Sequence, residues 1–106
     1  MDANELKYWV SFNRVPRVGR ARFNLLENYF GTLERAWHAR GTDLKAAGLD
    51  SRTVQLVVGR RDTIDPDAEL DRLREAGVKA LTWYDDEYPP RLKEIYDRPP
   101  VLYIRG

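Results

Sequence analysis

The sequence predicts a mostly α fold, in which five short helices form a compact unit and a short, incomplete α/β segment follows. Apolar residues in the first half recur at helical spacing, and Gly or Pro residues interrupt them at short intervals. After Gly77, the run from Val78 to Thr82 instead predicts a strand. We therefore expect a helical domain over residues 1–64, and a helix with two strands over residues 65–106.

Capping residues bound the expected helices of the first half. Thr32 and Thr42-Asp43 suit N-caps, and Gly31 suits a left-handed C-cap. The last of these helices begins after Asp50 and carries three valines that we expect to face inward: Val54, Val57 and Val58. The expected helices are residues 5–13, 19–30, 33–39, 44–47 and 52–61.

The second half begins with a strong helix start at Asp65-Pro66, because Asp suits the N-cap and Pro suits the first helical position. This helix is expected to stop at Gly77. A single helical turn over residues 91–95 and a second strand over residues 101–104 follow. Two strands joined through one small helix would leave unpaired edges, so we expect the chain to be a fragment of a longer protein.

The composition limits the classes of protein that the chain can represent. Of its 106 residues, 42% are apolar and 33% are charged, with a net charge of +1. No segment approaches the roughly 20 apolar residues that span a bilayer, and the first residues lack the features of a signal peptide. These observations predict a cytoplasmic domain.

Residue types typical of catalytic or metal sites are sparse. The sequence has no cysteine, which excludes disulfides, thiol nucleophiles and cysteine-based zinc sites. His38 has no partner at ligand spacing, and Asp85-Asp86-Glu87 is expected to form a solvated turn rather than a Mg²⁺ site. No nucleophile with a base and no phosphate loop is visible. We expect no enzymatic activity, no cofactor and no bound metal.

Charge is distributed unevenly along the chain. Residues 1–64 contain 11 Lys or Arg and 7 Asp or Glu, whereas residues 65–106 contain 7 and 10. A surface that meets a polyanion is therefore expected on the first half, although an ordinary mixed surface is an equal alternative.

The turn from Val15 to Gly19 is the main candidate site. The first turn of the helix after it has unsatisfied N–H groups and a partial positive charge, which suit an anion. Arginines surround the turn and would add charge. The candidate DNA-binding residues are Arg14, Arg17, Val18, Gly19, Arg20 and Arg22.

An apolar-Pro-x-apolar-Gly turn between two helices resembles the helix-hairpin-helix element of DNA-repair proteins, whose backbone N–H groups bind a phosphate. This element usually has Gly where the chain has Arg17. Arg17 therefore either supplies a side-chain contact or marks a purely structural corner. Gly48-Leu49-Asp50 resembles a second, degenerate copy, as in the tandem, RuvA-like five-helix unit. Asp50 there would repel a phosphate, and Arg60 and Arg61 are candidate outlying contacts.

The segment from Leu81 to Gly106 carries a more specific resemblance. Its Tyr88-Pro89-Pro90 turn and its Pro99-Pro100-Val101-Leu102-Tyr103 strand resemble the DNA-processing protein A family, also called DprA or Smf. The earlier matching residues are Tyr8-Trp9, Val15 to Gly19, Phe23, Phe30-Gly31, Ala36-Trp37, Ala47-Gly48-Leu49 and Asp65-Pro66. The resemblance implies an N-terminal helix-hairpin-helix region and the start of a nucleotide (Rossmann-like) fold.

The same resemblance implies binding of single-stranded DNA and loading of the RecA recombinase during natural transformation. The family's principal Gly-Ser-Arg loop is absent from this sequence, so its binding residues are not carried over. Two hypotheses remain: an accessory module that binds the DNA backbone, or a structural or protein-interaction domain without DNA contact. The sequence leaves open whether the chain forms a homodimer. We expect Trp83, Tyr84, Tyr88 and Tyr103 to pack a turn rather than to stack on bases.

Overall fold

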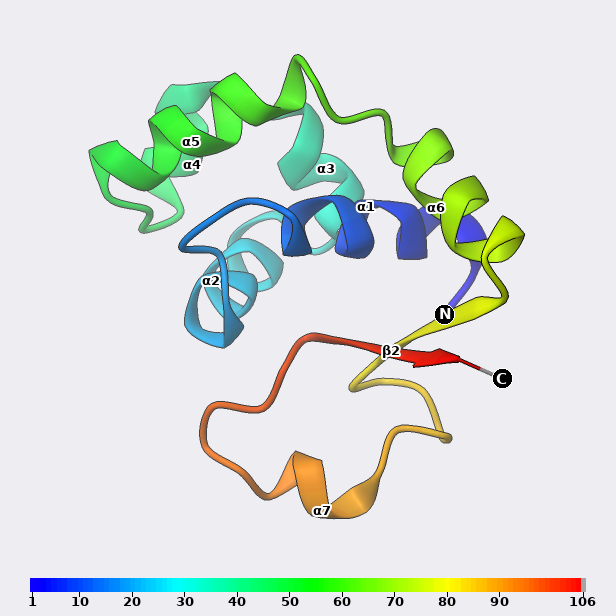
Figure 1. Ribbon diagram of the computed structural model, residues 1–106. Helices are drawn as coiled ribbons and strands as arrows, with labels where there is room; N and C mark the ends of the chain where they lie inside the picture. Colours follow the sequence, from blue (N-terminus) through cyan, green and yellow to red (C-terminus); the bar gives the residue numbers. More distant parts are fainter. Residues whose placement is uncertain (106) are drawn as a thin grey trace.

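The structure is a computed structural model that describes residues 1–105, and within that range it is mostly helical (Figure 1). The predicted mostly α character is therefore confirmed. The helices are α1 (Ala3–Asn13), α2 (Arg20–Phe30), α3 (Leu33–His38), α4 (Gly41–Ala46), α5 (Ser51–Arg61), α6 (Pro66–Glu75) and α7 (Pro90–Lys93). The strands are β1 (Val78–Thr82) and β2 (Val101–Arg105). None of these helices has the length and hydropathy needed to cross a membrane.

Helix α1 lies at the centre of the molecule and contacts α3, α6 and both strands (Figure 1). Trp9 of α1 is 1% exposed, and its ring packs against Phe23 of α2 and Trp83 of the loop after β1. Phe12, one turn further on, packs edge-to-face on Trp37 of α3. A single cluster of buried apolar residues therefore includes side chains from both halves of the sequence.

The two strands pair with each other in antiparallel register, with Val78 opposite Arg105 and Thr82 opposite Val101. The sequence indicated both strands but not this pairing. The connection between them extends away from the helices and carries α7 at its far end (Figure 1). Side-chain bonds order this connection, because Tyr88 is fully buried and donates its O–H to the carbonyl of Pro99 at 2.7 Å.

The helix caps follow local chemistry in most cases. Thr32 accepts from the N–H of Arg35, and Asp65 accepts from the N–H of Asp67, as the sequence predicted. The prediction that Thr42-Asp43 caps α4 was wrong, because α4 begins at Gly41 with Arg40 at the N-cap. A Cβ at Gly41 would lie 3.4 Å from Cγ1 of Val54, so the first residue of α4 packs against α5.

One valine of α5 does not face inward as predicted. Val57 is fully buried and Val54 is half-buried, but Val58 is 39% exposed. Since α5 packs mainly against α4, the apolar face that it needs is narrower than its sequence pattern suggested.

Candidate nucleic-acid interface

The candidate turn joins the end of α1 to the start of α2. Its two apolar residues, Val15 and Val18, are buried, and the N–H of Val18 donates to the carbonyl of Val15. Between them Arg17 has a φ of +73°, in the left-handed region that L-residues with side chains rarely occupy. The backbone therefore adopts, at Arg17, the conformation that glycine accommodates most easily.

The first turn of α2 has free backbone donors. The first helical bond is from the N–H of Phe23 to the carbonyl of Gly19, at 2.9 Å. Neither a side-chain cap nor a backbone acceptor within residues 1–105 engages the N–H groups of Arg20, Ala21 and Arg22. A hollow of about 410 Å³ lies over this turn, lined by residues 17–22 and by Asp97. The residues that carry these amides thus line an open hollow.

Asp50 engages two of the candidate arginines. The guanidinium of Arg17 bonds Oδ2 of Asp50 at 3.2 Å and Oγ1 of Thr53 at 3.2 Å. The guanidinium of Arg22 lies 3.6 Å from Oδ1 of Asp50 and donates to the carbonyl of Arg17 at 2.9 Å. Hydrogen bonding from Thr53 and the charges of Arg17 and Arg22 hold the pKa of Asp50 below its ordinary value. This carboxylate would therefore compete with a bound phosphate for the guanidinium groups of Arg17 and Arg22.

Arg20 has no carboxylate partner within residues 1–105. Its guanidinium lies over the ring of Tyr96, with 4.3 Å between the central carbon and the ring centroid. Its buried Nε also lacks a hydrogen-bond partner. Arg20 is therefore the candidate arginine whose charge is least neutralised by its neighbours.

Arg14 and Val18 have different positions from the other candidates. Arg14 donates to Glu69 of α6 at 2.8 Å, and Glu69, which is only 6% exposed, also pairs with Arg72. Arg14 therefore fastens α6 to α1 and does not line the hollow. The side chain of Val18 lies in the core, so Val18 offers only its backbone to the hollow.

Of the outlying candidates, Arg61 has a structural role. It donates to the carbonyls of Trp37 and Ala39, at 2.6 and 2.5 Å, and so ties the end of α5 to the end of α3. Burial lowers the pKa of Arg61. Arg60 is exposed and lies away from the hollow over α2.

No family model and no solved structure matches the chain. It is 33% identical over 107 residues to Protein Smf of Synechocystis sp. (strain ATCC 27184 / PCC 6803 / Kazusa), and the alignment covers the whole chain. The chain belongs to the DprA/Smf family. It corresponds to 27% of the length of this Smf relative.

In this DprA/Smf chain, sequence reasoning missed three residues that line the hollow or contact its arginines. Asp97 and Tyr96 come from the loop before β2, and Thr53 comes from α5. No local pattern marks any of them, because each meets the turn through the tertiary fold. Asp50 was expected to repel a phosphate at its own turn, Gly48-Leu49-Asp50. The structure places its carboxylate beside Arg17, in the turn from Val15 to Gly19.

Proposed function

We propose that this segment binds the sugar-phosphate backbone of single-stranded DNA at the N-terminal turn of α2, without reading sequence. The observation that carries the proposal is the set of free amides on Arg20, Ala21 and Arg22, three residues that line an open hollow together with Arg17 and Asp97. In the longer DNA-processing protein, this site would be accessory to others outside the segment.

The chemistry of the site fits a phosphate ester. Unpaired N–H groups at a helix N-terminus donate to phosphate oxygens, and the helix dipole favours the negative charge. Arg20 needs no bond to be broken before it meets a phosphate, whereas Arg17 and Arg22 must release or share Asp50. We therefore propose modest affinity that depends strongly on salt.

The α1-turn-α2 unit acts, in this proposal, as a helix-hairpin-helix element. Its left-handed residue at Arg17 and its open helix start after Gly19 support that reading. The α4-turn-α5 unit would be the degenerate second copy of a RuvA-like pair, with Asp50 bonded to Arg17 between the two turns. On this view residues 1–64 are the helical domain, and residues 65–106 lead into a Rossmann-like core.

The family resemblance supports a wider role for the longer protein. We propose that it binds single-stranded DNA in the cytoplasm and assists loading of the RecA recombinase during natural transformation. The segment itself would take no part in catalysis.

A second candidate function is a structural or protein-interaction domain without DNA contact. The observation that favours it is that Arg14, Arg17 and Arg22 all bond carboxylates of the chain itself. Binding to purified RecA without any DNA shift would support this second function.

The deciding experiment compares DNA binding by the chain and by its Arg17→Ala, Arg20→Ala, Arg22→Ala triple variant. Fluorescence anisotropy with a labelled oligo-dT strand should show weaker binding by the variant. The slope of log affinity against log salt should fall by roughly 0.7 for each lost phosphate contact.

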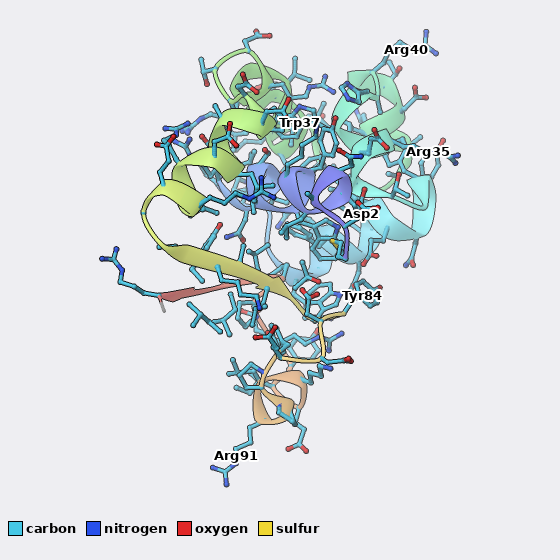
Figure 2. The ribbon with its side chains drawn as sticks, turned by 90° about the vertical axis from the view of Figure 1, so that its right-hand side faces the viewer. Asp2, Arg35, Trp37, Arg40, Tyr84 and Arg91 are labelled. Carbon is cyan, nitrogen blue, oxygen red and sulfur yellow. The ribbon has the colours of Figure 1, made fainter. Side chains whose placement is uncertain are left out.

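A matched control removes three exposed arginines elsewhere: Arg35, Arg40 and Arg60. Figure 2 shows Arg35 and Arg40 on the outer surface of the helical part, and all three are exposed. This control has the same net charge as the triple variant. If both variants bind alike, general charge rather than the turn accounts for binding.

A further inference from the structure

A second hollow lies along the same helix as the candidate phosphate site. It measures about 280 Å³ and is lined by Asn24, Trp83, Tyr84, Lys93 and Arg98. Asn24 follows Arg20 by one turn of α2, and Arg98 follows Asp97, which lines the first hollow. Arg20 and Asn24 are about 6 Å apart along the helix axis, so the two hollows are neighbours.

Tyr84 presents an exposed ring that its neighbours hold in place. The side chain is 61% exposed, and Figure 2 shows it at the edge of the molecule, between the helices and the loop that carries α7. Its O–H donates to Glu27 at 3.2 Å, and its ring packs edge-to-face on Trp9 at 5.8 Å. An aromatic ring fixed in this way loses little conformational entropy when another ring stacks on it.

The charges at this hollow differ from those at the first. The guanidinium of Arg98 lies 4.8 Å from the ring centroid of Trp83. Neither Arg98 nor Lys93 forms an ion pair within residues 1–105, and none of the five lining residues is acidic. Both cations are therefore available to an anion.

The acidic residues that follow Tyr84 do not cancel this charge. Asp85 accepts from the N–H of Thr82 at 2.7 Å, and Glu87 pairs with Lys79 of β1. Two of the three acids in the Asp85-Asp86-Glu87 turn are thus engaged with β1.

We propose that this second hollow is a nucleobase subsite, in which a base stacks on Tyr84 while Lys93 and Arg98 meet the adjoining phosphate. The inference rests on the proposed function, because the phosphate at α2 would deliver the next nucleotide to it. Stacking on an aromatic side chain requires an unpaired base, so the subsite would favour single strands over duplex. It takes any of the four bases, since every base has a π face.

The test compares two probes of equal length, an oligo-dT octamer and an abasic deoxyribose-phosphate octamer. The unmodified chain should bind the dT strand on the order of tenfold more tightly than the abasic strand. Tyr84→Ala should remove this difference and leave binding of the abasic strand unchanged. Tyr84→Phe keeps the ring and should bind both probes as the parent does.

Tyr29 offers the matched control, because it is an exposed tyrosine of α2 that does not line the hollow. Tyr29→Ala should retain the preference for the dT strand. Equal binding of both probes by the parent overturns the subsite and leaves the phosphate site intact. Failure of both probes to bind overturns the proposed function itself.

Photocrosslinking locates the base without any substitution. An octamer containing 5-iododeoxyuridine should form its adduct at Tyr84, identified by peptide mass spectrometry. Adducts that fall instead on Tyr29 or Tyr103 would overturn the subsite, even if Tyr84→Ala fails to fold.

Discussion

The guanidinium of Arg17 lies 3.2 Å from a carboxylate oxygen of Asp50, 33 residues further along the chain. This bond joins the turn before α2 to the N-cap of α5. This bond therefore has two effects: it holds two helix starts together, and it places a negative charge beside Arg17 and Arg22 of the candidate phosphate site.

Removing that carboxylate should strengthen DNA binding. Asp50→Asn frees Arg17 and Arg22, and we expect affinity for an oligo-dT strand at low salt to rise several-fold. Asp71→Asn changes the net charge equally at an exposed position of α6 and should raise affinity much less. Anisotropy titrations of both variants would measure the difference, and equal gains would argue against a role for Asp50 at the site.

The positive φ of Arg17 predicts an unusual order of stability among its variants. Arg17→Ala loses the bonds to Asp50 and Thr53 and keeps the left-handed strain, whereas Arg17→Gly loses the same bonds and relieves the strain. We expect the Gly variant to be more stable than the Ala variant by about 1 kcal/mol. Urea unfolding measures both free energies. An Ala variant as stable as the Gly variant would contradict the left-handed conformation.

A carboxylate at the N-cap of α2 should abolish DNA binding without lowering the stability of the fold. A Cβ at Gly19 would meet no atom within 4 Å, so a side chain fits there. Gly19→Asp would place its carboxylate on the free amides, preserving or raising stability by a few tenths of a kcal/mol while abolishing DNA binding.

Gly19→Ser is the control for this change, because it caps the same amides without charge. We expect its binding to fall between that of the parent and that of the Asp variant, as measured by the same anisotropy titration. Unaltered DNA binding by Gly19→Asp would show that the amides at the start of α2 do not bind the phosphate.

Asp85 should contribute to stability at neutral pH and lose that contribution in acid. Burial raises the pKa of Asp85, but the N–H of Thr82 and the amino terminus outweigh it and hold the pKa below the ordinary value of 3.8. The folded state therefore favours the ionised form. The resulting stabilisation is present above pH 3.8 and is lost as the pH falls through the lowered pKa.

Urea unfolding between pH 2 and pH 6 tests this dependence. Asp85→Asn should lose less stability than the parent over the acid part of that range. Asp86→Asn alters the neighbouring exposed carboxylate and should behave as the parent does. If the parent and the Asp85→Asn variant lose stability equally as the pH falls, Asp85 is not the source of the acid dependence.

Local chemistry made much of the fold predictable. Thr32 and Asp65 mark their helix starts through bonds within three residues, Pro66 takes the first helical position of α6, and β1 coincides with the expected strand. Errors arose where tertiary packing decides. Helix α4 begins at Gly41, which packs near Val54 of α5, and the exposure of Val58 depends on which helices cover α5.

The candidate site was predictable only in its backbone. A helix start after Pro16 and Gly19 implies free amides, because no residue there can cap them with a side chain. The partners of the arginines lie far away in sequence: Arg14 meets Glu69 and Arg17 meets Asp50. Nothing in a single sequence specifies such pairs, and they determine how much positive charge the site offers.

The most direct test of the central claim is a titration of the ¹⁵N-labelled chain with an oligo-dT octamer, followed by amide chemical shifts at low salt. If a DNA phosphate binds at the start of α2, the amides of Arg20, Ala21 and Arg22 shift most and saturate together. Shifts concentrated around Arg60 or Arg91, with these three amides unmoved, would contradict binding at α2.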